Sequence, residues 1–177
     1  RRFFVRRVDL PVFEEDGRTF LARASPGSYD SVVMDAYAGE SPPSHLFTVE
    51  AYRLVRRAMS FDGVGLANLI SYTRGPESLL ACSVAKTIGA VFPWVEAYGV
   101  EETGGPTNVL FLFGNRPRKL RALSSVPIHP QVALHLKGIM NRKLNLVSPS
   151  AIVLTDEFSP IEVLSLKVRR FMRDHLR

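Results

Sequence analysis

The stretch YDSVVMDAYAGESPPSHL, residues Tyr29–Leu46, decides the fold of this chain. Its apolar run, Val32-Val33-Met34, ends on a single carboxylate, Asp35, and a loop of small residues, glycine and two prolines follows. An apolar run without alternation predicts a strand that is covered on both faces, as in a parallel sheet. Ligands of such sheets bind outside the carboxyl ends of the strands. Asp35 is therefore the first residue at which chemistry is expected.

Strands and helices are expected to alternate outward from this stretch. Residues 17–24 form a predicted helix, Thr48 is the predicted N-cap of a second helix, and Pro76 suits the first turn of a third. The predicted strands span residues 8–14, 31–35, 64–70, 95–100 and 108–113, and further predicted helices span residues 130–140 and 160–176. This order predicts an α/β fold in one domain, residues 1–177: a mostly parallel sheet with helices on both faces and a C-terminal antiparallel hairpin.

The composition is that of an ordinary globular chain with a basic balance. The 177 residues are 46% hydrophobic and 23% charged, and the net charge is +6. No apolar stretch approaches the length of a membrane span, and one cysteine, Cys82, excludes an internal disulfide. The histidines are scattered without metal-ligand spacing, so no metal site is expected. We expect a soluble intracellular chain, either cytoplasmic or mitochondrial.

Basic clusters lie near both ends of the chain and around residues 116–121. They are interpreted as solvated faces, because no aromatic residues interleave with them as they would in a stacking platform for nucleic acid. Nucleic acid is therefore not an expected partner.

Four motifs resemble the spermidine synthase family, the polyamine aminopropyltransferases. They are EDGRTFL (Glu15–Leu21), YDSVVMDAYAGESPPSHLFT (Tyr29–Thr48), GVGLANL (Gly63–Leu69) and LTDEFSPIE (Leu154–Glu162). The resemblance implies a Rossmann-like methyltransferase fold, with decarboxylated S-adenosylmethionine or S-adenosylmethionine as the donor of an aminopropyl or methyl group. It also implies roles for two acids: Asp16 is a cofactor-binding residue near the adenine amino group, and Asp35 is the catalytic residue that helps to deprotonate the attacking amine.

Elementary chemistry agrees with the role that the resemblance implies for Asp35. An amine is mostly protonated at neutral pH, and a carboxylate at a strand tip can hold the ammonium group and accept its proton. Structural alternatives remain: Asp16 as a turn or helix cap, and Asp35 as a cap of the loop that follows it. His45 is interpreted as a hydrogen-bonding residue of that loop rather than a catalyst. Asp156 and Glu157 either face the substrate side or start the last helix.

Two departures from the family pattern bear on activity. Polyamine-making members carry a second aspartate three residues after the acid of the strand tip, and Ala38 stands in that place here. One missing charge-assisted contact costs about 1.5–3 kcal/mol, which argues against putrescine as the acceptor. The family's glycine-rich loop and the acid that ends its second strand are also absent. The chain is thus expected to begin after the second strand of a sheet with the order 3-2-1-4-5-7-6, which leaves a gap in its middle.

The gap has three explanations: residues that precede Arg1, strands supplied by another chain, or a rearranged sheet. Two functions therefore stay open. The first is an aminopropyl or methyl transferase that a missing N-terminal segment completes. The second is a catalytically inactive relative, a pseudoenzyme that acts as a structural subunit of a larger complex, with a protein partner in the gap; a homo-oligomer is a further option. RNA binding through the basic clusters is the weakest alternative.

Overall fold

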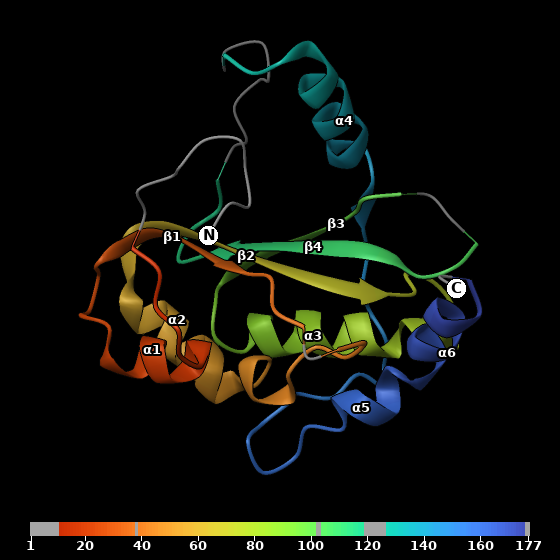
Figure 1. The fold of residues 1–177 in the computed structure, drawn as a ribbon, viewed down its shortest axis with the longest axis horizontal. Coiled ribbons are helices and arrows are strands. Elements are labelled where there is room, and N and C mark those ends of the chain that lie inside the picture. Colours follow the sequence, from red (N-terminus) through yellow and green to blue (C-terminus); the bar gives the residue numbers. More distant parts are fainter. Residues whose placement is uncertain (1–10, 38, 102–103, 119–126, 176–177) are drawn as a thin grey trace.

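The computed structural model describes residues 11–37, 39–101, 104–118 and 127–175. Within these ranges the chain forms a five-stranded sheet in the order β1-β2-β4-β3-β5. Helices α1, α2, α3, α5 and α6 lie on one face of the sheet, and α4 stands on the other side (Figure 1). The strands are β1 (Tyr29–Met34), β2 (Met59–Ser71), β3 (Trp94–Gly99), β4 (Thr107–Gly114) and β5 (Lys143–Leu144), and the helices are α1 (Gly17–Arg23), α2 (Val49–Ala58), α3 (Leu79–Gly89), α4 (Pro130–Met140), α5 (Ile161–Leu164) and α6 (Leu166–His175).

The strand order confirms the predicted α/β fold class. β1 pairs parallel with β2, and β4 pairs antiparallel with both β2 and β3. The order β1-β2-β4-β3 corresponds to the 4-5-7-6 part of the order that the resemblance implies. The hairpin of β3 and β4 is also confirmed. Among the described residues only the β1–β2 pair is parallel, so the sheet that was predicted to be mostly parallel is mixed in this part of the chain.

β1 is an edge strand with one exposed face in the described part of the sheet, and the exposed face corrects the expectation that it is covered on both faces. It pairs with β2 on one side, and no described strand lies on the other. Val33 is 64% exposed, whereas Met34 is buried in the core. The helices below β1 cover one face of the strand, and successive side chains point to opposite faces, so the apolar run alternates in burial.

The predicted strand of residues 8–14 is wrong where the structure describes it. Residues 11–14 are exposed and pair with no described strand, and residues 8–10 lie outside the described residues. Pro11 cannot donate a backbone hydrogen bond to a ladder, which weakens a strand at this position. Phe13 instead packs on Phe20 of α1, with ring centroids 5.2 Å apart.

The core lies between the sheet and the helices α2 and α3. Thr48 is the N-cap of α2, as predicted, and its Oγ1 accepts a hydrogen bond from Ala51 N. Tyr52 of α2 is fully buried and packs against Phe113 of β4, with ring centroids 5.6 Å apart. Phe113 also contacts Phe92, 4.7 Å away by the same measure. These aromatic contacts fix α2 and the residues that follow α3 under β4.

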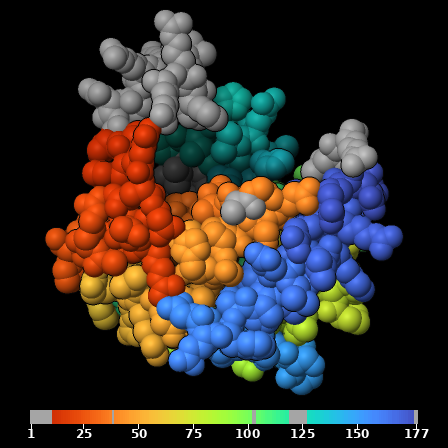
Figure 2. Space-filling model, turned by 60° about the horizontal axis from the view of Figure 1, so that its bottom comes forward, coloured from red at the N-terminus to blue at the C-terminus, as the bar shows by residue number. Residues whose placement is uncertain are grey.

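The C-terminal segment is hydrogen-bonded to the helices α2 and α3 and lies beside the loop after β1. Leu154 N donates to Thr87 Oγ1 of α3, and Leu154 O accepts from Val49 N of α2, both at 2.9 Å. Figure 2 shows the C-terminal residues (blue) beside the residues that follow β1 (orange). The predicted helix of residues 160–176 is divided into α5 and α6, with Ser165 between them. Because Arg18 also forms an ion pair with Asp156, the first, second and fourth sequence motifs are neighbours in space.

The helix α4 has the bounds predicted from the sequence, yet none of its residues is buried. Leu134 is 74% exposed. None of the helices in the described ranges is long and apolar enough to cross a membrane.

Candidate functional site

The acid at the tip of β1 is held by the neighbouring strand. Met34 lies opposite Ala67 of β2, so the next residues of the two strands, Asp35 and Asn68, come together. Asn68 Nδ2 donates a hydrogen bond to Asp35 Oδ1 at 3.0 Å. Within the described residues Asp35 makes no other hydrogen bond, and it is exposed. Its Oδ2 is therefore available to a ligand.

The loop after Asp35 is fastened to the end of β2 by Tyr37. The Tyr37 hydroxyl accepts a hydrogen bond from Ile70 N. Burial raises the pKa of Tyr37 to about 12, so the hydroxyl stays protonated at neutral pH. Ala38, which stands in the place of the family's second aspartate, lies outside the described residues.

Asp16 is the N-cap of helix α1, which is the structural alternative to a cofactor-binding role that the sequence left open. Its Oδ1 accepts hydrogen bonds from the backbone nitrogens of Arg18 and Thr19, each at 3.0 Å. Its Oδ2 lies 2.7 Å from His45 Nε2. The hydrogen bond with His45 lowers the pKa of Asp16, and the one from Thr19 acts in the same direction. A carboxylate oxygen can accept more than one hydrogen bond, so a cap and a ligand contact are compatible at Asp16.

Asp156 connects the C-terminal segment to α1 and to the start of α2. It forms an ion pair with the guanidinium of Arg18, in which Arg18 Nη1 donates to Asp156 Oδ1 at 2.7 Å. Thr48 Oγ1 donates to the same Oδ1 at 2.7 Å. The Arg18 guanidinium lowers the pKa of the Asp156 carboxyl. Asp156 thus joins α1 and the start of α2 rather than starting α5.

A cavity of about 350 Å³ lies beside β1, and we call it the strand-tip cavity. Phe20, Leu21, Val32 and Leu46 contribute apolar walls, and Asp35 contributes a carboxylate. Gly17 also lines the cavity, so Asp16 stands one residue from it. The volume lies in the range of about 300–1,000 Å³ that is usual for small-molecule sites. The arrangement suits a flat, partly apolar ligand that also carries hydrogen-bond donors.

Sequence reasoning predicted Asp16 and Asp35 as site residues, and it did not consider Asn68 and Tyr37, which contact the tip of β1 and the loop after it. Asn68 lies inside the motif GVGLANL, where it is a polar residue in an otherwise apolar strand. That polarity could have indicated a contact at the strand end. Across the described residues, no group of His, Cys, Asp and Glu side chains could hold a metal ion.

Comparisons with known proteins agree with the four motifs. No family model matches the chain. It is 24% identical over 180 residues to a probable polyamine aminopropyl transferase of Bifidobacterium longum, over 93% of this chain and 40% of that protein. It is 42% identical over 55 residues to a polyamine aminopropyltransferase of Clostridium acetobutylicum, over 31% of this chain and 19% of that protein.

The fold is similar to that of a probable spermidine synthase from Corynebacterium glutamicum, with a TM-score of 0.60 and 17% identity. That match covers 80% of this chain and 52% of the other chain. The chain thus spans about two fifths of the length of the first relative and about half of the solved one. The chain is spermidine synthase-like: it is related to the polyamine aminopropyltransferases and has a Rossmann-like, methyltransferase-type fold, as its motifs predict.

Proposed function

We propose that this chain carries the acceptor side of an aminopropyl-transfer site. In this proposal Asp35 holds the ammonium group of an amine acceptor and takes up its proton. Asp16 holds the amino group of the donor's adenine. The observation that carries the proposal is the position of Asp35: it lines the strand-tip cavity with Oδ1 held by Asn68, while its Oδ2 makes no hydrogen bond within the described residues.

The chemical step is a displacement at carbon. When bound, decarboxylated S-adenosylmethionine supplies a propyl carbon that is attached to a sulfonium. Asp35 accepts the proton that the ammonium loses, which leaves a lone pair on nitrogen. The nitrogen–carbon bond forms as the carbon–sulfur bond breaks, and that electron pair stays on sulfur in methylthioadenosine. Transfer of a methyl group from S-adenosylmethionine would require the same proton acceptor.

The strand-tip cavity is suited to the nucleoside part of such a donor. Phe20, Leu21 and Val32 provide apolar walls for the adenine ring. Asp16 is already oriented by the start of α1 and by His45, so binding an adenine amino group would require little reorganisation.

The remaining part of the donor site is assigned to a polypeptide segment outside the described residues. The chain spans 40% of the length of one relative and 52% of another. In the described ranges the outer edge of β1 has no strand partner, and Val33 beside it is exposed. A strand added parallel to β1 would satisfy its backbone groups. An N-terminal segment or a partner protein could supply that strand.

The experiment is calorimetry with methylthioadenosine and with S-adenosylmethionine. We expect heat of binding with methylthioadenosine. Asp35→Asn should leave nucleoside affinity nearly unchanged and abolish turnover once the site is completed. Asp30→Asn is the matched control, because Asp30 lies on the same strand and hydrogen-bonds Ser60 without lining the strand-tip cavity. Equal losses of nucleoside affinity and turnover in Asp35→Asn would contradict the role assigned to Asp35.

A second function rests on the exposed edge of β1. In it the chain is a catalytically inactive relative and a structural subunit, and a partner protein occupies the same edge. The exposure of Val33 and the alanine in place of the family's second aspartate favour it. Folded protein that gives no heat with either nucleoside would end the enzyme proposal for this chain and favour the structural one.

A further inference from the structure

A groove of about 430 Å³ lies at the sheet edge remote from β1, and we call it the α3–β5 groove. It lies where the pairing of β3 with β5 stops: β5 pairs only with Ala97 and Tyr98, and residues 95–96 of β3 have no described strand partner on that side. Its lining residues come from α3, from β3 and from residues 143–151. None of them lines the strand-tip cavity, so the two are separate sites.

The lining of the α3–β5 groove is mainly small and aliphatic. Cys82 and Ala97 are buried in it, with 3% and 6% of their surface exposed. Other lining side chains pack against the hydrophobic core and are only partly buried: Ala85, Val95, Leu144 and Leu146. Val147 lies at the outside of the groove and is 79% exposed. No aromatic side chain is among the described lining residues, so the groove suits an aliphatic chain rather than a stacked ring.

Lys86 of α3 supplies the groove with a cation that no described carboxylate neutralises. Its Nζ donates a hydrogen bond to Ala151 O at 2.6 Å, and both residues line the groove. Lys86 makes no other hydrogen bond and no ion pair with the described residues. A lysine ammonium carries more N–H donors than this single contact uses, so donors remain for a ligand.

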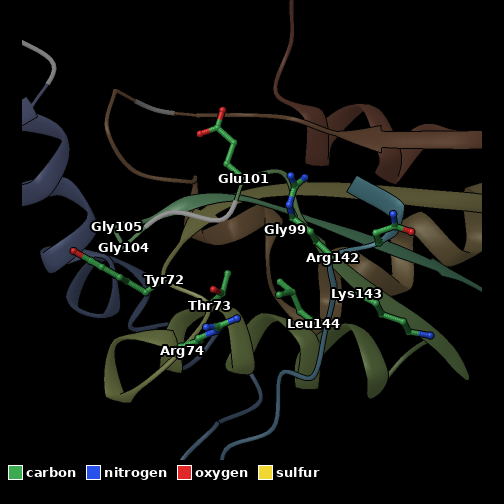
Figure 3. Close-up of a pocket in the computed structure, with 11 residues that line it drawn as sticks. Tyr72, Thr73, Arg74, Gly99, Glu101, Gly104, Gly105, Arg142, Lys143 and Leu144 are labelled. Atoms are coloured by element: carbon green, nitrogen blue, oxygen red, sulfur yellow. The ribbon is translucent and has the colours of Figure 1, made fainter. Parts of the chain in front are cut away.

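The other charged lining residues, Glu96 and Lys143, neutralise each other. Lys143 Nζ donates to Glu96 Oε1 at 2.6 Å, and the Tyr98 hydroxyl donates to Oε2 of the same carboxylate, also at 2.6 Å. Figure 3 shows Lys143 directed away from the neighbouring cavity, which Arg142 lines. The α3–β5 groove therefore keeps one positive charge without a counter-charge, that of Lys86, and this charge favours an anion.

We propose that the α3–β5 groove binds an aliphatic carboxylic acid, with its carboxylate on Lys86 and its hydrocarbon chain along the apolar side chains. The volume of the groove is usual for a small-molecule site. Burial of the chain against the apolar lining supplies most of the affinity, and the ammonium of Lys86 selects the acid over a neutral chain of the same length. Such a ligand has the opposite charge to a polyamine and carries no nucleobase, so the proposal goes beyond the transferase function.

The test is a titration of the folded chain with octanoate and with octan-1-ol at low ionic strength and below the micellar concentration, by calorimetry and by amide chemical shifts. The two probes have the same chain length and differ in the charged group. We expect octanoate to bind at millimolar concentration or below, with shifts centred on Ala85, Val95 and Leu146. Octan-1-ol should bind about 3- to 10-fold more weakly, a modest ratio because Lys86 is exposed to solvent.

Lys86→Gln removes the cation and leaves the apolar lining in place. It should lower the affinity for octanoate to that for octan-1-ol and leave the affinity for octan-1-ol unchanged. Lys137→Gln is the matched control, because it makes the same charge change on α4 and lies outside the groove; it should leave both affinities unchanged. If Lys86→Gln fails to fold, Val147→Glu replaces it: a carboxylate at this exposed position should weaken the binding of octanoate and not that of octan-1-ol.

Three results would overturn the proposal: no binding of octanoate to the folded wild type, equal affinities for octanoate and octan-1-ol, or wild-type affinity for octanoate in Lys86→Gln. A fourth arm uses vesicles of phosphatidylglycerol. Attachment to these vesicles without binding of free octanoate would also overturn the proposal and make the groove a contact with a lipid surface. Because the probes contain neither adenosine nor an amine, a negative result here leaves the proposed transferase function untouched.

Discussion

Asn68 donates a hydrogen bond from Nδ2 to Oδ1 of Asp35 at 3.0 Å, between the tips of two neighbouring parallel strands. The Oδ1 of Asn68 is buried and has no hydrogen bond within the described residues. Asp35 is thus the contact that orients the amide, and the amide in turn holds one carboxylate oxygen. A carboxylate with one fixed oxygen and one free oxygen is well arranged to receive a proton from a ligand.

We expect Asn68→Asp to destabilise the fold by about 1–3 kcal/mol at neutral pH, because the variant loses the hydrogen bond and places two carboxylates side by side. The loss should shrink in acid, where one of the two carboxylates becomes protonated. Urea unfolding at neutral and at acid pH measures both effects. The control is Asn108→Asp on β4, since the Asn108 side chain makes no hydrogen bond with described residues. Equal losses in the two variants would argue against a specific Asn68–Asp35 contact.

The Asp16 carboxyl should contribute stability that depends on pH. Its pKa in the folded state is lowered, first by the hydrogen bond with His45 and then by the backbone of Thr19. A group with a depressed folded pKa stabilises the fold above its unfolded pKa, and this stability is lost as the pH falls through the folded pKa.

Asp16→Asn therefore tests this contribution, because asparagine is also a good N-cap and the change removes mainly the charge. We expect a loss below about 1 kcal/mol at neutral pH, since the pair with His45 is exposed, and no loss in strong acid. Urea unfolding across the acid range checks this. Asp174→Asn serves as the control on the exposed face of α6. A loss for Asp16→Asn that is constant with pH would assign its effect to capping alone.

Two tyrosines should respond in opposite ways to the loss of the hydroxyl. The Tyr52 hydroxyl is buried without a hydrogen-bond partner among the described residues, whereas the Tyr37 hydroxyl accepts from Ile70 N. Tyr52→Phe should be neutral or stabilising, because it removes an unsatisfied buried group. Tyr37→Phe should cost about 0.5–1.5 kcal/mol. Thermal and urea unfolding of the pair give the comparison, and a clear loss for Tyr52→Phe would show that its hydroxyl is satisfied.

Gly65 of β2 should not tolerate a side chain. A Cβ at this position would come within 2.0 Å of the ring of Phe113, which is itself buried against Tyr52 and Phe92. Gly65→Ala should therefore destabilise the fold by about 1–3 kcal/mol through overpacking. Gly89→Ala at the end of α3 is the matched control, because nothing lies within 4 Å of its Cβ position. There we expect a gain of up to about 1 kcal/mol in the free energy of unfolding.

Local sequence patterns were sufficient to predict most of the helices and strands. The helix 130–140 was predicted with the bounds that α4 has, and Thr48 was predicted as the cap of α2. In both cases the signal is a proline or a capping side chain that acts on the backbone within one turn. The prediction of a strand at residues 8–14 is wrong in its described part, because apolar residues alone do not form a strand when no other strand pairs with them. The burial of β1 was also misjudged, because edge and interior positions depend on neighbours that are remote in sequence.

The sequence by itself determined the order of the elements, the relationship to the polyamine aminopropyltransferases and the position of Asp35 at a strand tip. Only the tertiary structure decided what surrounds that acid. The contact of Asp35 with Asn68 and the contact of Asp16 with His45 both join segments that are distant along the chain. Strand register creates the first contact, the packing of α1 against the loop after β1 creates the second, and neither is encoded in the periodicity of a single element. The sequence therefore specified the chemical groups, while the pairing of the strands specified which of them act together.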